Sequence, residues 1–547
     1  MAVTATLSIR DIPFITFSAA NDAATLLFEL IQAKASPPNL ASDENSIGFQ
    51  LSLPLLADDP NSGDGGLGSN HLGWEIGAGT PPVMLDKGLR RDDPPVLLCP
   101  PGATPASKAV RKYIKDVHAS IYLHQNTGVL MLKALCDRPI IYEQGDMHDN
   151  DLELRLDEWG NSTTCVLRRE RNYIRIGPYR FLIKFNAQSP ETNHRFITHM
   201  NEKLKSEYHG LVRSRLFNFI PMGLPYTRTR WNIWLHQQIP TTEITTGVNI
   251  YTGQPVAIKK LRNKDTIINQ LQMALQIKDK QKNGILGIID VWCDHQTSPP
   301  CFFHLQGSNR HAECRYTYYS MPLASYNFMD LPWSKLEVDK RLLYLHQTLS
   351  ALAELHNQQL VHGNIQPGSL LIMGDELRLD SETLSTQKVV LSLSMRRIEK
   401  MVSSGANICV APEVWQNGGA TTDLDGTKLD IWAIASSWIY AFGKPPNWKI
   451  ATKDNHKWLQ DQVKRLSKLT PFIDLLHKML AWEPQDRPTV AEALASDAWH
   501  LVQTMKHEME DQKTQKRKAE MQSDGVRTLQ TETATPEDKI NFPLQRE

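Results

Sequence analysis

QLVHGNIQPGSLLI, at Gln359–Ile372, is the stretch around which the second half of the chain is organised. Its histidine, His362, lies between apolar residues, a proline follows five positions later, and a pair of leucines stands behind it. The second residue after the histidine is Asn364. An amide has no basic lone pair at neutral pH, so it can accept a hydrogen bond but cannot take up a proton. A reaction that needs a side chain to accept a proton at this position therefore finds no suitable group in Asn364.

Taken together, these residues resemble the catalytic loop of eukaryotic protein kinases, which is usually written HRDLKPxN. In that family the Asp accepts the proton of the acceptor hydroxyl, the Lys neutralises transferring charge, and the Asn holds a magnesium ion. The matching positions of this chain are Asn364, Gln366 and Ser369. The resemblance therefore implies a kinase fold without ordinary kinase catalysis.

The segment TGQPVAIK at Thr252–Lys259 resembles the third strand of a kinase small lobe. Lys259 matches the lysine that holds the nucleotide's α- and β-phosphates in that family. The family's glycine-rich turn, whose glycines let backbone N–H groups approach phosphates closely, is replaced. Its positions fall on Gln237, Ile239 and Thr242. The next helix should supply a Glu to the lysine, yet Ile267–Ile277 contains no acid.

ELRLDSETLS, at Glu376–Ser385, aligns without gaps on the family's metal-binding segment, LKLxDFGLS. This alignment puts Ser381 at the metal-binding Asp and leaves Asp380 one residue early. Side chains alternate along an extended backbone, so the offset aims the carboxylate at the opposite face unless the loop slips. We therefore expect no cofactor. ATP with magnesium, bound after such a slip with the help of Asp380, Asp375 or Glu382, is the alternative.

Three further motifs match positions that hold the kinase fold together, namely CVAPEV at Cys409–Val414, LDIW at Leu429–Trp432 and WEPQDRPT at Trp482–Thr489. The resemblance implies that Glu413 and Arg487 pair inside the large lobe. It also implies that Asp430 caps the backbone behind the catalytic loop. These three residues are predicted to be structural.

Apolar residues return at helical spacing in four segments of the same region, which predicts a helix-rich lobe. The segments are Asp339–Asn357, Ile431–Phe442, Pro471–Leu480 and Val490–Leu494. We therefore predict a bilobal α+β protein-kinase-like fold over residues 229–503, as the second part of a multidomain protein.

The first half of the chain shows short runs that alternate or cluster apolar residues, as half-buried strands do. They are Trp74–Gly79, Val117–Leu123, Gly128–Ala134 and Tyr173–Phe185. Regularly spaced short strands predict a β-sandwich. The segments IG at Ile76–Gly77, HASI at His118–Ile121 and IGPYRF at Ile176–Phe181 resemble the forkhead-associated domain, a sandwich that reads phosphothreonine.

The phosphate-binding residues of that domain are largely replaced in this chain. Ala78 stands where the family has its phosphate-contacting Arg, Lys115 stands where it has the loop Ser, and Cys136–Pro139 contains no NGT turn. Phosphate recognition needs donors in a fixed fork or cradle. We therefore predict a docking or structural module. A phosphopeptide reader that uses the point charges of Arg111, Lys112 and Lys115 is the alternative.

The remaining segments complete the predicted organisation, in which residues 46–190 form the forkhead-associated-like sandwich with inserts such as Pro81–Ala109. Residues 1–45 are a leader of unspecified structure with one amphipathic segment at Asn21–Gln32, and residues 191–228 are a helical linker. Residues 504–547 are a charged flexible tail. Its basic run, Lys513–Lys518, fits a solvated helix face or a nuclear import signal.

One cysteine and histidine cluster has spacing that would suit zinc. Cys301, His304, His311 and Cys314 flank a turn and would give four ligands at the base of a hairpin. Two ordinary strands with buried cysteines explain the same residues. Spacing without a known zinc knuckle favours the second interpretation.

Composition narrows the class of protein. Lysine plus arginine and aspartate plus glutamate both number 60, so no net field indicates nucleic acid or an acidic membrane as partner. The seven cysteines are sparse and odd in number, which is untypical of a secreted disulfide framework. No stretch reaches about 18 apolar residues. We expect a soluble intracellular protein of the cytoplasm or nucleus, with protein partners that include phosphoproteins.

These observations give three functional hypotheses. The first is a pseudokinase tethered to a degenerate sandwich, acting as a signalling scaffold or allosteric partner. The second is an active serine/threonine kinase with relocated metal ligands, which needs Asp380 to face the nucleotide beside Lys259. The third is a sensor that binds ATP without turnover. The order of the two domains resembles that of fungal checkpoint kinases, which raises the expectation of a signalling role.

Overall fold

The computed structural model describes most of the chain. The described residues are 13–35, 37, 39–43, 46–52, 73–80, 95–124, 126–144, 151–186, 189–192, 194–196, 198, 229–230, 232–239, 244–262, 284–294, 315–373, 388–392, 408–419, 423–443, 452–466, 470–500 and 502–504. They fall into two compact units. The first unit comprises Met1–Ile277, Gly287–Ser325 and Asp375–Arg378, and the second comprises Lys278–Leu286, Tyr326–Gly374 and Leu379–Glu547.

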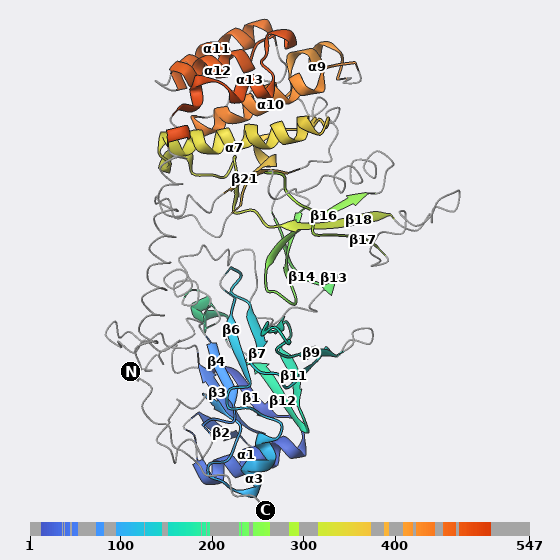
Figure 1. Cartoon of the computed structure of the whole chain (residues 1–547), viewed down its shortest axis with the longest axis vertical. Helices are drawn as coiled ribbons and strands as arrows, with labels where there is room; N and C mark the ends of the chain where they lie inside the picture. Colours follow the sequence, from blue (N-terminus) through green and yellow to red (C-terminus); the bar gives the residue numbers. More distant parts are fainter. Residues whose placement is uncertain are drawn as a thin grey trace, which may run out of the picture. The chain divides into compact units, whose positions relative to one another are not determined.

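Two sheets form the beginning of the first unit (Figure 1). The seven-stranded sheet has the order β2 (Leu40–Asp43), β3 (Ser46–Ser52), β1 (Pro13–Ala19), β12 (Tyr179–Phe185), β11 (Arg171–Ile176), β8 (Ile140–Glu143), β9 (Leu152–Leu154). The five-stranded sheet has the order β10 (Thr164–Val166), β7 (Leu130–Ala134), β6 (Ala119–Leu123), β4 (Gly73–Gly77), β5 (Val96–Leu97). All pairs are antiparallel except β4 with β5.

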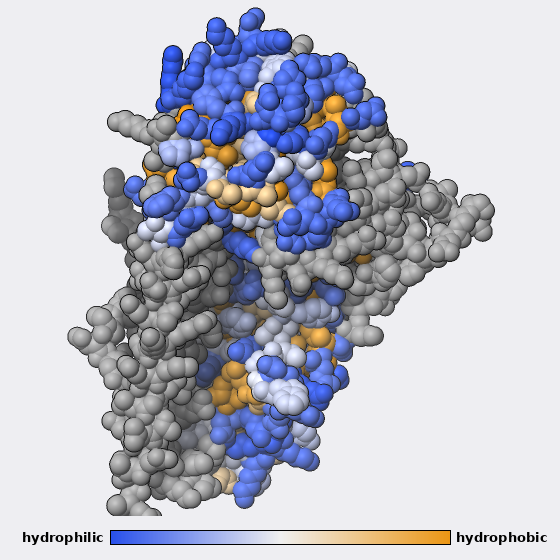
Figure 2. Space-filling model, turned by 45° about the horizontal axis from the view of Figure 1, so that its top comes forward, coloured by the Kyte–Doolittle hydropathy of each residue, from blue (hydrophilic) through white to orange (hydrophobic). Residues whose placement is uncertain are grey.

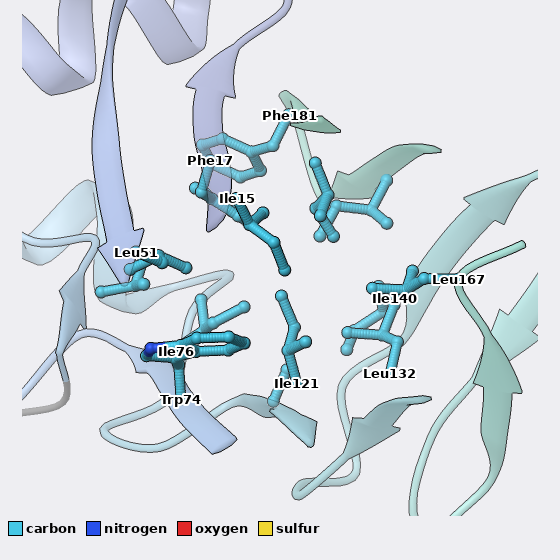
Figure 3. Packing of buried hydrophobic residues seen from close by; sticks show 14 of the residues in the cluster. Ile15, Phe17, Leu51, Trp74, Ile76, Ile121, Leu132, Ile140, Leu167 and Phe181 are labelled. Atoms are coloured by element: carbon cyan, nitrogen blue, oxygen red, sulfur yellow. The ribbon is translucent and has the colours of Figure 1, made fainter. Parts of the chain in front are cut away.

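The two sheets enclose one hydrophobic core. Apolar residues at every second strand position point inward, as the pleat requires. In Figure 3, Ile15, Phe17, Leu51 and Phe181 of the seven-stranded sheet lie opposite residues of the five-stranded sheet. These opposing residues are Trp74, Ile76, Ile121 and Leu132. This part of the chain is therefore a two-layer β-sandwich, and the four predicted strand segments all lie in it.

The prediction of an unspecified leader at residues 1–45 is wrong for its described part. Strand β1 pairs with β3 on one side and with β12 on the other, so it is internal to the sheet. Helix α1 (Asp22–Ala35), which the spacing at Asn21–Gln32 predicted, buries Leu27, Phe28 and Ile31 in the core. The strand escaped prediction because its partner β12 lies far along the chain, and local sequence does not encode such a pairing.

Three further segments of the prediction are only partly described. The insert at Pro81–Ala109 contains strand β5 and the start of helix α3 (Pro105–Arg111). The linker at 191–228 and the tail at 504–547 lie almost entirely outside the described residues.

A six-stranded antiparallel sheet completes the first unit. Its order is β13 (Thr229–Arg230), β14 (Ile233–Gln238), β15 (Ile244–Asn249), β16 (Pro255–Arg262), β18 (Tyr316–Pro322), β17 (Asp290–Cys293). Strand β16 is central and pairs with β15 and β18. This sheet lies where the sequence predicts a small lobe.

The second unit is rich in helices, and its visible surface is mostly hydrophilic (Figure 2). The principal helices are α7 (Val338–Asn357), α9 (Pro412–Gln416), α10 (Gly426–Trp438), α11 (Lys453–Leu466), α12 (Thr470–Met479) and α13 (Val490–Leu494). A small sheet has the order β19 (Tyr326–Asn327), β20 (Leu370–Met373), β21 (Lys388–Leu391). Helix α10 is buried from Leu429 to Trp438 and forms the centre of the unit. The four helical segments predicted from spacing in this region overlap helices α7, α10, α12 and α13.

Two general features of the described residues bear on the predictions. None of their helices combines the length and apolar character needed to cross a bilayer. Their cysteines are all buried free thiols, namely Cys99, Cys136, Cys165, Cys293 and Cys409.

Candidate functional site

The loop from Leu360 to Ser369 joins α7 to β20 in the second unit. Helix α7 ends because Gln359 takes a left-handed conformation with φ of 57°. The N–H of Leu360 then returns to the carbonyl of Leu355 at 3.0 Å, which satisfies a carbonyl that the helix end leaves open. Gly363 is also left-handed, with φ of 68°, a conformation that glycine adopts without steric cost.

Asp430 holds this loop from the central helix α10. Its carboxylate is buried and accepts hydrogen bonds from the backbone N–H groups of His362 and Gly363, both at 2.8 Å. The Nε2 atom of His356 lies 3.1 Å from the same carboxylate. The structure thus has the backbone cap that the resemblance implies for Asp430.

His362 connects the loop to strand β21. Its Nδ1 accepts from the N–H of Asn364 at 3.2 Å, so the proton of the neutral ring is on Nε2, which donates to the carbonyl of Ser392 at 3.0 Å. Burial lowers the pKa of His362, and the nearby Asp430 carboxylate opposes that shift. The ring therefore acts as a neutral structural link and not as a proton carrier.

Asn364 and Ser369 occupy the positions of the family's base and of one metal ligand, and both are buried. The Ser369 hydroxyl donates to the carbonyl of Gln366 at 2.8 Å and accepts from its N–H at 3.0 Å. The carbonyl of Ser369 accepts from the N–H of Ser392 at 2.8 Å. Ser369 thus uses its hydroxyl to close the short turn Pro367–Ser369, and it fixes the loop to the end of β21.

The strand beside the loop is not the one that the alignment selected. Strand β20 pairs with Lys388–Leu391, in the register Leu370 opposite Leu391. The described partner strand is therefore KVVL and not the LRL run of the gap-free alignment. In LKLxDFGLS the metal-binding Asp is the second residue after the strand, and the second residue after Leu391 lies outside the described residues. Two apolar runs, ELRL and KVVL, compete for β20, and the second contains two valines, which favour strands, where the first contains none. The segment that holds Asp375, Asp380, Ser381 and Glu382 lies outside the described residues.

Lys259 lies half-buried on the central strand β16 of the first unit, opposite Ile244 of β15 and Tyr319 of β18. The positions expected for a glycine-rich turn carry side chains in and beside β14. Thr246 holds a strand irregularity there, because its hydroxyl donates to the carbonyl of Gln237 at 3.0 Å and accepts from its N–H at 3.2 Å. Thr242 and the expected partner helix at Ile267–Ile277 lie outside the described residues.

Arg487 and Glu413 form a buried ion pair in the second unit. The Nη1 and Nη2 atoms of Arg487 donate to the two carboxylate oxygens of Glu413 at 2.6 and 2.7 Å. The remaining donors of the guanidinium bind the carbonyls of Ala481, Lys428 and Trp482. All five N–H groups of the arginine are therefore satisfied.

The three candidate phosphate-binding residues of the sandwich differ in their contacts. The Arg111 guanidinium binds the carbonyls of Ala78, Gly79 and Thr80 and lies 2.9 Å from the Asp116 carboxylate. It thus stabilises the loop after β4 from inside the molecule. Lys115 Nζ lies 3.8 Å from the exposed carboxylate of Asp137, while the ammonium of Lys112 lies 5.6 Å from the ring centre of Tyr113.

The predicted zinc ligands Cys301, His304, His311 and Cys314 all fall outside the described residues. Within the described part of the chain, no group of three or more His, Cys, Asp or Glu side chains is arranged to hold a metal ion.

Comparison with known proteins identifies one region of the chain. A family model described as "Protein kinase domain" matches residues 241–499. Serine/threonine-protein kinase ste20 of Emericella nidulans is 24% identical over 313 residues, which cover 54% of this chain and 33% of that protein. Serine/threonine-protein kinase pakA of Talaromyces marneffei is 25% identical over 300 residues, which cover 52% of this chain and 41% of that protein.

A third relative matches a shorter part. Serine/threonine-protein kinase PLK2 of Mus musculus is 27% identical over 158 residues, which cover 28% of this chain and 22% of that protein. The chain thus spans less than half the length of each of these three relatives.

Proposed function

Residues 241–499 form a protein kinase-like domain, and we propose that this domain does not transfer phosphate and serves as a signalling scaffold or allosteric partner. The observation that carries this proposal is the internal bonding of the loop from His362 to Ser369. The position of the catalytic Asp carries an amide, and the hydroxyl at one metal position closes the loop itself.

The sizes of the expected losses support this proposal. Removal of a general base costs on the order of 10²–10⁴ in rate. Phosphoryl transfer depends even more on positioned metal ions and phosphate donors, which supply electrostatic stabilisation. Within the described loop, between α7 and β20, no residue carries a carboxylate. Asp430, which supports the loop from α10, is already bound to two backbone N–H groups.

For the N-terminal sandwich we propose a docking role on a forkhead-associated-like framework, with protein partners. Arg111 is the most enclosed of the candidate phosphate ligands of the sandwich. Its guanidinium is hydrogen-bonded to three backbone carbonyls and to Asp116. Recognition of phosphate needs donors that are directed outward as a fork. The engagement of Arg111 thus favours docking over the reading of phosphothreonine.

The competing function is an active serine/threonine kinase with relocated metal ligands. The names of the three relatives favour it, since each is called a serine/threonine-protein kinase. It requires a carboxylate such as Asp380 to hold magnesium beside a nucleotide on Lys259.

A thermal-shift titration of the full chain with ATP, with and without magnesium or manganese, tests the proposal. A ligand at 100 times its Kd would raise the melting temperature by roughly 5–10 °C. We expect no shift at millimolar ATP under either condition, because the metal and phosphate ligands are replaced. A metal-dependent shift that is lost in Lys259→Met would overturn the proposal and favour the active kinase. A metal-independent shift would favour the nucleotide sensor.

A further inference from the structure

We infer that the five-stranded sheet of the sandwich is a receptor for the turn between β15 and β16, and that it thereby fixes the strand that carries Lys259. The turn comprises Ile250–Gln254, and it belongs to the kinase-like domain. Both partners lie in the first unit. The inference does not depend on whether the kinase-like domain has lost catalysis.

Three carbonyl groups of the turn accept hydrogen bonds from the sandwich. The N–H of Val166 donates to the carbonyl of Ile250 at 2.8 Å, and the Thr127 hydroxyl donates to the carbonyl of Gly253 at 3.1 Å. The Thr164 hydroxyl donates to the carbonyl of Tyr251. Two of these donors come from β10, which is an edge strand of its sheet. An edge strand has backbone groups with no strand to pair with, and here the turn satisfies one of them.

The fit is close enough to require glycine at one position. Gly253 has φ of 72°, and a Cβ atom there would lie 2.7 Å from His124 Cδ2 and 2.8 Å from the Met131 sulfur. Both neighbouring side chains are buried, so they have little room to move. The contact with the sandwich therefore depends on the left-handed, side-chain-free backbone at Gly253 as well as on the carbonyl acceptors of the turn.

Apolar side chains of the six-stranded sheet and its turn pack into the hydrophobic core of the sandwich. Trp234, Val248 and Ile250 of the six-stranded sheet and its turn are buried members of the sandwich core cluster. Tyr251 and Leu323 pack against the same cluster. A boundary between two independent domains would show few such contacts.

The turn itself is held rigidly, which lets it transmit the position of the sandwich to β16. The Asn249 side chain accepts from the N–H groups of Tyr251 and Thr252 at 2.9 and 3.0 Å. The N–H of Gly253 donates to the carbonyl of Asn249 at 2.9 Å. Strand β16 begins directly after the turn and contains Lys259. A partner that binds or distorts the sandwich should therefore act on the Lys259 strand.

Hydrogen exchange of the full chain, followed by mass spectrometry, tests the inference with Gly253→Val. This variant should accelerate exchange in peptides that cover β16 and β7 by roughly tenfold or more, because the added side chain cannot be accommodated. The matched control is Gly160→Val. Gly160 has φ of 78°, but no atom lies within 4 Å of its Cβ position, so the control has the same backbone strain without the contact. Peptides from α10 should exchange as in the wild type.

A milder variant keeps the test decisive if Gly253→Val does not fold. Thr127→Val retains the shape of the side chain and removes the donor to Gly253, together with the contact of the hydroxyl with His124 Nδ1 at 3.1 Å. We expect it to accelerate exchange in β16 in the same direction by a smaller factor, with α10 unchanged. If neither variant changes exchange in β16 more than Gly160→Val does, the sandwich and the Lys259 strand are not coupled, and the inference is wrong.

Discussion

Replacement of Arg487 by leucine is expected to lower the free energy of unfolding of the second unit by about 3–5 kcal/mol. The substitution leaves the Glu413 carboxylate buried without its cation, since both nitrogen donors that reach it belong to Arg487. It also removes the donors to the carbonyls of Ala481, Lys428 and Trp482. Urea denaturation of the full chain, followed by tryptophan fluorescence and by exchange in α10, measures the change.

Arg155→Leu is the matched control for this substitution. Arg155 pairs with Glu153 at 3.5 Å, but both side chains are at least half exposed, at 62% and 50%. An exposed pair contributes about 0–1 kcal/mol, so the control should stay close to the wild type. The double variant Arg487→Leu with Glu413→Leu should lose less than the sum of the two single changes, because it leaves no unpaired charge. Equal stability of Arg487→Leu and Arg155→Leu would refute this role of the pair.

Asp430→Ala is expected to cost about 2–6 kcal/mol, since each of two enclosed N–H groups left without an acceptor costs about 1–3 kcal/mol. The donors that lose their acceptor are the N–H groups of His362 and Gly363. Exchange in peptides that cover residues 360–369 should accelerate together with the loss of stability. Asp430→Asn should lose less, because the amide keeps one acceptor oxygen.

Asp425→Ala provides the control on the same helix. Asp425 caps the start of α10 by accepting from the N–H of Thr427 at 2.9 Å, in an exposed position. Loss of such a cap costs about 0.5–2 kcal/mol and should leave the loop peptides protected. The proposed role of Asp430 would be contradicted if Asp430→Ala left exchange in residues 360–369 at the level of this control.

Sequence predicted the parts of the fold that local patterns encode. Helices α7, α12 and α13 follow apolar spacing within one segment, and their predicted bounds agree closely with those of the structure. Strand β1 was missed because a short apolar run becomes a strand only through its distant partners β3 and β12. The pairing of β1 with β3 and β12, and not the strand propensity of its own residues, therefore determined that this segment is a strand.

The same distinction applies to the candidate site. The motifs placed Glu413, Asp430 and Arg487 in positions where the structure gives them buried partners. The strand beside the loop was misassigned, because two apolar runs follow β20 along the chain and only the second pairs with it. The bonds of Ser369 to Gln366 and of Arg111 to three carbonyls depend on loop conformations, which residue spacing alone does not specify.

A phosphotransfer assay of the purified full chain tests the central claim most directly. The chain is incubated with ATP and magnesium or manganese, with and without a generic serine/threonine substrate, and phosphate on both proteins is counted by mass spectrometry. Lys259→Met serves as the background control, because it removes the residue at the nucleotide position. We predict that wild type and Lys259→Met incorporate the same background amount of phosphate. Metal-dependent transfer by the wild type that Lys259→Met abolishes would contradict it.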